Sequence, residues 1–194
     1  MAMRESLALS FVIAATTVAL GQAEKAVQGL DFITDSEANA IYAVVVPEMW
    51  ASTSRPKDLI MLRQETEDVS AMGVSACGSW LPRRDPEWVE IWKNFLQENA
   101  RRKVLPLALP ISQPYRLITL AEIEQINARL GLQVPGDQPD DPPYVAVSAI
   151  GFNSDKTKAI VYVRVRNRGR WSGMERRDGK WITAPDSSIC SWIA

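Results

Sequence analysis

Residues that commonly carry catalytic chemistry are scarce in this sequence, and none of its 194 residues is a histidine. A Ser-His-Asp or Cys-His site, a histidine-ligated zinc and a general base with an unperturbed pKa near neutrality are therefore excluded. The GxSxG turn, the phosphate-binding P-loop, the GxGxxG fingerprint and the EF-hand spacing are also missing from the sequence. Carboxylate chemistry is the enzymatic option that remains.

Three carboxylates cluster just after a short apolar run, at Glu65, Glu67 and Asp68. At the edge of a sheet such a group could hold a general acid and a general base, as the hydrolysis of a polysaccharide requires. A solvated acidic turn has the same composition, so both interpretations stay open. A second acidic group, whose spacing matches no recognised calcium loop, comprises Asp137, Asp140 and Asp141. We expect neither a metal nor a cofactor.

Arginines recur at every second position near the C-terminus, at Arg164, Arg166, Arg168 and Arg170. Alternate residues of one continuous strand share a face, so we expect these guanidinium groups to form a basic surface beside Trp171. Such a surface suits acidic glycans, phosphate groups or an acidic protein. The alternative is a solvated strand face whose arginines pair with Glu175 and its neighbours.

Seven tryptophans are many for a chain of this length. Most fall on the apolar faces of predicted elements, where we expect them to belong to the core. Trp50, Trp80 and Trp171 instead fall in predicted loops. A loop tryptophan can stack on a sugar or anchor a partner, although it can also cap the edge of a core.

The first 23 residues resemble a cleavable secretory signal. Arg4 lies in a short polar head, residues 7–20 form an uncharged apolar run, and small residues precede Glu24. We therefore expect a mature domain of residues 24–194 in the periplasm or secreted medium of a bacterium, with no membrane span after cleavage. An uncleaved N-terminal anchor is the alternative.

The two cysteines of the chain, Cys77 and Cys190, fit this compartment, because an even number of thiols in an oxidising environment usually pairs. No histidine or CxxC motif is present to activate a thiol, so a structural disulfide is favoured over a reactive cysteine. The formal net charge of −1 provides no field that would attract nucleic acid or an anionic membrane. Any partner must be recognised locally, and the oligomeric state is left open.

Two capping boxes and one proline-initiated stretch predict three helices. Thr34 with Glu37, and Thr119 with Glu122, have the spacing at which each side chain can bond the other residue's backbone amide. A further helix is expected from Pro86, because apolar and polar positions alternate there at helical spacing. Its polar stripe, expected to face away from the core, consists of Glu87, Glu90, Lys93, Asn94 and Gln97.

The C-terminal third has the alternation of antiparallel strands, clearest where Val161, Val163 and Val165 alternate with polar or aromatic neighbours. Asp178-Gly179 indicates a tight hairpin, since both residues tolerate positive φ. An apolar run at residues 59–62 predicts one earlier strand. The expected fold class is α+β: N-terminal helices packed on a C-terminal three- to four-stranded antiparallel meander, an order also found in cystatin-like and nuclear-transport-factor-like folds.

Three short motifs in this region resemble a pattern found in secreted bacterial proteins of unassigned function. They are Gly151-Phe152-Asn153, the strand Ala159-Ile160-Val161-Tyr162-Val163, and Gly179-Lys180-Trp181. The resemblance implies the antiparallel meander and no catalytic residue. Where such proteins are expected to carry a glycine-rich loop, this chain has the arginine-containing segment 168–173.

These observations favour a non-catalytic, extracytoplasmic binding or interaction module for an anionic or carbohydrate-bearing partner. The alternative is a small secreted hydrolase that uses the carboxylates near Glu65 on a polysaccharide-type substrate. A third hypothesis is a structural or inhibitor-like domain that fills the cleft of a partner.

Overall fold

The computed structural model describes residues 30–53, 58–69, 86–130, 144–165 and 168–193, without the side chains of residues 130 and 185–193. By its internal contacts the chain divides into two units, Met1–Leu30 and Asp31–Ala194. All helices and strands named below belong to the second unit.

Several predicted features lie outside the described residues, so they stay predictions. They are the secretory signal, Cys77 of the expected disulfide, Trp80, Arg166, and the aspartates Asp137, Asp140 and Asp141. Cys190 belongs to a described strand, but its side chain is not described.

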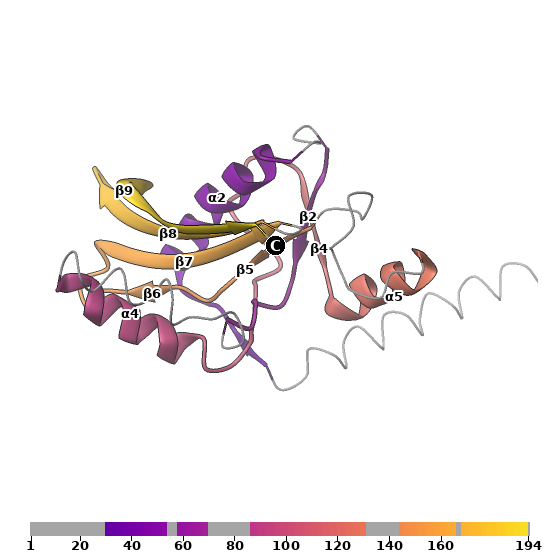
Figure 1. Ribbon diagram of the computed structural model, residues 1–194, viewed down its shortest axis with the longest axis horizontal. Helices are drawn as coiled ribbons and strands as arrows, with labels where there is room; N and C mark the ends of the chain where they lie inside the picture. Colours follow the sequence, from indigo (N-terminus) through magenta and orange to yellow (C-terminus); the bar gives the residue numbers. More distant parts are fainter. Residues whose placement is uncertain (1–29, 54–57, 70–85, 131–143, 166–167, 194) are drawn as a thin grey trace, which may run out of the picture. The chain divides into compact units, whose positions relative to one another are not determined.

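A mixed sheet runs through the second unit (Figure 1). In spatial order its strands are β4 (Tyr115–Ile118), β2 (Ile60–Arg63), β5 (Val145–Val147), β7 (Lys158–Val165), β8 (Arg168–Arg177) and β9 (Lys180–Ile193), with β6 (Gly151–Phe152) also paired to β7. The strands from β5 to β9 pair antiparallel, whereas β2 pairs parallel with both β4 and β5.

The α+β class is therefore confirmed, but the expected C-terminal antiparallel meander is not confirmed as a separate sheet, because β2 and β4 join the same sheet in parallel. The expected strand near residue 60 lies inside the sheet, next to β4, a strand that the residue patterns did not predict. The segment 168–173, expected to be a loop, is the first half of β8. Both differences arise from long-range pairing, which local residue patterns do not specify.

Helices cover both faces of the sheet (Figure 1). The helix α2 (Ser36–Ala51) packs in one apolar cluster with Val161 and Val163 of β7, while α4 (Glu87–Glu98) packs in another with Ile160 and Tyr162. The helix α5 (Leu120–Leu130) contributes Ile123 to a third cluster. Because alternate residues of a strand point to opposite faces, α2 and α4 lie on opposite sides of β7.

A second, two-stranded sheet sits beside the end of α4. In it β1 (Asp31–Phe32) pairs parallel with β3 (Lys103–Val104), and the Ile33 amide continues the pairing with a hydrogen bond of 2.9 Å to the Val104 carbonyl. This pairing fixes the segment that enters α2 next to the segment that leaves α4.

Of the predicted turn and capping motifs, two are confirmed and one is wrong. The Thr119–Glu122 capping box is confirmed, with reciprocal bonds of 2.8 Å and 3.2 Å between side chains and backbone amides. The Asp178-Gly179 hairpin is confirmed too, with φ of 51° and 75°. The first box is wrong by one residue: Asp35 caps α2, accepting from the Glu37 amide at 2.9 Å.

Candidate functional site

The structure divides the predicted basic surface between the two faces of the sheet. Arg164 is paired with Gly169, whereas Arg170 is paired with Val163, and residues directly opposite each other in an antiparallel pair share a face. Because β7 ends at Val165 and a new strand begins at Arg168, the alternation does not continue across the connection. Arg164 therefore lies on the α4 side of the sheet, and Arg168 and Arg170 lie on the α2 side.

Trp171 is not available as a surface anchor, because it is a core residue with 2% of its surface exposed. Its ring lies 5.1 Å from that of Phe95 and 4.9 Å from that of Tyr162. Trp50 is likewise buried, within α2. The expectation that these tryptophans lie in loops is wrong, because Trp50 belongs to α2 and Trp171 belongs to β8. Both are covered by elements that are distant in sequence.

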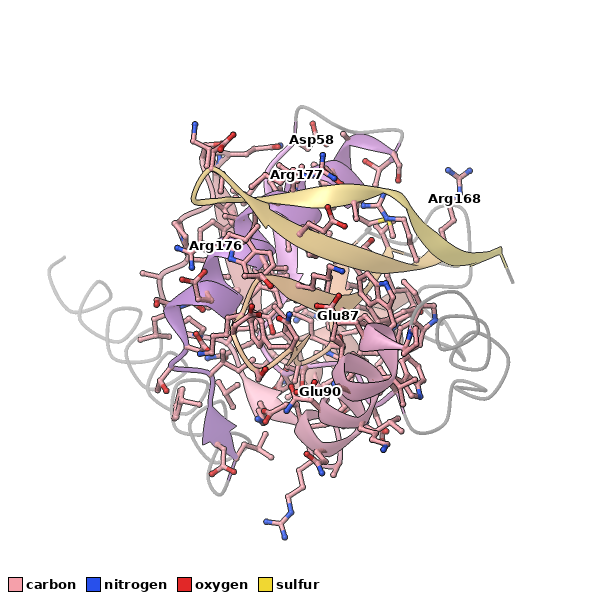
Figure 2. The ribbon with its side chains drawn as sticks, turned by 90° about the vertical axis from the view of Figure 1, so that its left-hand side faces the viewer. Asp58, Glu87, Glu90, Arg168, Arg176 and Arg177 are labelled. Carbon is pink, nitrogen blue, oxygen red and sulfur yellow. The ribbon has the colours of Figure 1, made fainter. Side chains whose placement is uncertain are left out.

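The described arginines at the surface of this region are mostly paired with carboxylates. Arg170 contacts Glu48 of α2 at 2.8 Å, and Arg177 contacts Glu175 at 2.6 Å. Arg168 extends away from the sheet in Figure 2 and makes a 3.5 Å contact with the Ser52 carbonyl. The positive charge is thus largely neutralised rather than concentrated.

The acidic group after β2 serves the fold. Glu65 is 2% exposed and accepts a hydrogen bond of 3.1 Å from the Leu120 amide at the start of α5, where the helix dipole favours an anion. Glu67 lies between Arg63 at 3.0 Å and Arg164 at 3.3 Å. Asp68 is partly buried. These contacts do not place Glu65 and Glu67 as a general acid and a general base on opposite sides of one open site.

Arg63 holds this group together from inside the protein. The residue is 3% exposed, and its guanidinium donates to the carbonyls of Glu65 and Thr66 as well as to Glu67. Burial lowers the pKa of Arg63, and the Glu67 carboxylate opposes this effect. For Arg164, burial acts to lower the pKa, but Glu67 and Tyr144 together raise it above its usual value. The cluster of hydrogen bonds and ion pairs around Arg63 therefore has a structural role.

Replacing Glu67 by glutamine should therefore affect stability. We expect Glu67→Gln to lower the free energy of unfolding by about 2 kcal/mol, because it removes the carboxylate charge that is paired with the buried Arg63 guanidinium. Urea unfolding measures this loss, with Glu124→Gln on the exposed side of α5 as the matched control. A variant with unchanged stability would contradict the structural role.

A groove of about 670 Å³ lies in the second unit. One wall is the polar stripe of α4, and the other is formed by β1 and the start of α2. The lining residues are Phe32, Ile33, Thr34, Asp35, Ala38, Glu90, Lys93, Asn94, Gln97, Glu98, Lys103, Ala149, Ile150, Phe152, Asn153, Ser154 and Lys156. Most of them carry polar side chains.

Asn94 of α4 and Asn99, the residue that follows this helix, position the floor of the groove. The side-chain nitrogen of Asn99 donates to the Ala149 carbonyl at 3.0 Å, and its side-chain oxygen accepts from the Ala149 backbone amide at 2.9 Å. Asn99 thus makes the two hydrogen bonds that a neighbouring strand would otherwise make. Asn94 accepts from the Phe152 amide at 2.7 Å. Asn94 was expected to face away from the core, but it fastens the helix to β6. One residue before Ala149, the Ser148 carbonyl accepts a hydrogen bond of 2.9 Å from the Tyr42 hydroxyl. Burial of Tyr42 raises the pKa of this hydroxyl.

Opposite charges are paired along the groove. Lys156 contacts Asp35 at 2.7 Å, and Lys103 contacts Glu98. Burial acts to raise the pKa of Asp35, but hydrogen bonds from Lys156 and from the Glu37 amide outweigh it, and the pKa lies below its ordinary value. Lys93 and Glu90, the latter labelled on α4 in Figure 2, also line the groove, so its lining contains three lysines and three carboxylates. The groove carries no net charge.

Aromatic rings border this charge-balanced surface. Phe32 of β1 is 55% exposed and lines the groove, so its ring is accessible to a ligand there. Phe152 is partly buried, with its ring 5.8 Å from that of Trp181 and 5.5 Å from the Lys156 ammonium. The groove thus combines one accessible ring with amides and ion pairs.

Sequence reasoning missed this groove. Its lining comes from four separated parts of the chain, and the α4 polar stripe looked like an ordinary solvated face. The pairing of β1 with β3 has no recognisable signal in the sequence, since each strand has two residues. The available hint was the Gly151-Phe152-Asn153 motif, two of whose residues line the groove.

Comparisons with known proteins add no assignment: no family matches the sequence, and neither the curated proteins nor the solved structures contain a significant match. Within the described ranges, none of the helices has the length and apolar character needed to cross a membrane. The same ranges contain no cluster of three potential metal-ligating side chains among cysteines, aspartates and glutamates.

Proposed function

We propose that the protein is a non-catalytic binding module, and that the groove between α4 and β1 recognises a carbohydrate-bearing partner. The observation that carries the proposal is the groove itself, about 670 Å³ in volume and lined mainly by polar side chains. Sites for drug-like ligands are lined predominantly by apolar groups. A groove rich in amides and ion pairs suits a ligand rich in hydroxyl groups.

Three features of the groove support a saccharide. The exposed Phe32 ring offers an apolar face on which the C–H face of a sugar can lie. Gln97 and the paired charges offer both donors and acceptors to hydroxyl groups. The balance of charge favours a neutral chain over the anionic partner that the arginines had suggested.

The carboxylates of the groove support a binding role rather than hydrolysis. A glycosidase needs one carboxylic acid that stays protonated, which requires a raised pKa. The pKa of Asp35 is instead lowered, and Glu98 is paired with Lys103. The alternative of a hydrolase built on Glu65, Glu67 and Asp68 gains no support from their contacts with Arg63, Arg164 and α5.

The experiment is a glycan microarray probed with the purified full-length chain, followed by calorimetric titration of the strongest hit. We expect Phe32→Ala and Gln97→Ala each to weaken binding about fivefold to tenfold, through lost stacking and a lost hydrogen bond. Gln125→Ala, on the exposed part of α5, is the matched control and should bind like the parent.

An array without any bound glycan would overturn the proposal, as would equal binding by Phe32→Ala, Gln97→Ala and the parent chain. The same preparation, incubated with glycan and ester libraries, tests the hydrolase alternative. Product release that is abolished by Glu65→Gln or Glu67→Gln in folded protein would favour the enzyme. The extracytoplasmic location, proposed from the N-terminal signal, is tested by N-terminal sequencing of the protein recovered from periplasmic and culture-medium fractions.

A further inference from the structure

Lys156 occupies a backbone conformation that disfavours lysine. Its φ is +53°, in the left-handed region, and the other described non-glycine residue with positive φ is Asp178 at +51°. Glycine and asparagine adopt this conformation at lower cost. The turn between β6 and β7 therefore does not require a lysine here, and the side chain must account for its presence.

The Lys156 side chain is directed into the groove and is held there. Its ammonium lies 2.7 Å from Oδ2 of Asp35, a residue 121 positions away, and 5.5 Å from the centre of the Phe152 ring. Asp35 is fixed in turn, because its Oδ1 accepts the Glu37 amide at 2.9 Å as the cap of α2. The pair thus joins the N-cap of α2 to the turn between β6 and β7.

This pair places hydrogen-bond donors next to acceptors. An ammonium has three N–H donors, and a carboxylate has about four acceptor positions, so a single mutual contact leaves capacity on both groups. Both side chains line the groove and are partly accessible, with 46% of the Lys156 and 33% of the Asp35 side chain exposed. Two neighbouring hydroxyl groups match this arrangement, one accepting from Lys156 and the other donating to Asp35.

We propose that the Asp35–Lys156 pair is the specificity-determining element of the groove, and that it binds two adjacent hydroxyl groups of a neutral saccharide. This inference rests on the proposed carbohydrate-binding function and names the ligand class. The pair is neutral overall, so an added uronate or sulfate group would bring a second negative charge next to the Asp35 carboxylate. Neutral sugars should therefore bind more tightly than acidic ones.

The test uses calorimetric titration of the full-length chain with cellotetraose, maltotetraose and chitotetraose as neutral probes and tetragalacturonate as the acidic probe. We expect the best neutral probe to bind, and Lys156→Gly and Asp35→Asn each to weaken that binding at least tenfold. Asp35→Asn retains a good helix cap, and Lys156→Gly relieves the left-handed backbone, so both variants should fold. The matched control is Asp178→Gly, which makes the same backbone change outside the groove and should not alter binding.

The melting temperature separates recognition from folding. A lysine that served only the fold would lower the melting temperature when removed, whereas Lys156→Gly is expected to leave it unchanged or raise it. Binding of a neutral probe that is equal in Lys156→Gly and the parent would overturn this inference and leave the proposed function in place. Tighter binding of tetragalacturonate than of any neutral probe would also overturn it. Binding of no saccharide by the parent chain, here and on the array, would overturn both proposals.

Discussion

Replacing Gly151 by alanine is expected to lower the free energy of unfolding by about 3 kcal/mol, because the added methyl group overpacks the contact between β6 and α4. A Cβ atom on Gly151 would lie 2.5 Å from both the Cα and the backbone nitrogen of Phe95. These are backbone atoms of α4, so no side-chain rotation can relieve the overlap. The helix must move away from β6, and the packing of Phe95 against Trp171 moves with it.

Urea unfolding of Gly151→Ala measures this loss, and Gly179→Ala is the matched control. Gly179 has a φ of +75°, but a Cβ atom there would have no neighbour within 4 Å. We expect the control to cost only about 1 kcal/mol, from the left-handed backbone conformation. Similar losses for the two glycine variants would show that α4 does not approach β6 as closely as described.

Truncating Asn99 to alanine should lower the free energy of unfolding by about 3 kcal/mol. The Asn99 side chain is the hydrogen-bond partner of both the amide and the carbonyl of Ala149, and it also donates to the Phe95 carbonyl at 2.8 Å. Ala149 is 2% exposed, so its two backbone groups would be buried without these partners. Each such group costs about 1–3 kcal/mol.

Asn127 provides the comparison for Asn99. It is also buried, at 7% exposure, but within the described part of the chain its Nδ2 has no hydrogen-bond partner. We expect Asn127→Ala to lose less than about 1 kcal/mol in the same urea titration. If Asn99→Ala were no more costly than Asn127→Ala, the role of Asn99 as a substitute strand would be wrong.

Both large effects concern the junction that shapes the groove. Gly151 allows α4 to approach, while Asn94 and Asn99 fasten the helix to residues 149–152. Variants at this junction should consequently weaken glycan binding as well as stability, whereas Lys156→Gly should weaken binding without lowering stability. That contrast distinguishes the residues that build the groove from those that contact its ligand.

The Gly151-Phe152-Asn153 motif has a structural explanation at each position. Gly151 has no side chain and so allows α4 to approach closely. Phe152 packs against Trp181, and Asn153 organises the following turn. The Asn153 Oδ1 accepts from the Thr157 amide at 3.0 Å and from the Lys158 amide at 2.8 Å. The motif thus serves turn and packing, as the sequence had suggested, and it also sets the end wall of the groove.

The sequence by itself determined the features whose interacting groups lie within a few residues of each other. The Thr119–Glu122 capping box and the Asp178-Gly179 turn are of this kind, because their hydrogen bonds and φ angles depend on adjacent residues. The alternation of β7 was also readable, since side chains of any strand alternate between two faces. The absence of histidine excluded whole classes of mechanism without reference to any fold.

Only the tertiary structure decided where those elements meet. A new strand begins at Arg168, which places Arg164 and Arg170 on opposite faces, and β8 carries Trp171 into the core. The partners of Glu67 and Lys156 are likewise set by strands and helices that are far apart in sequence. The physical reason is that burial and ion pairing depend on contacts across the whole chain, whereas residue patterns specify only local geometry.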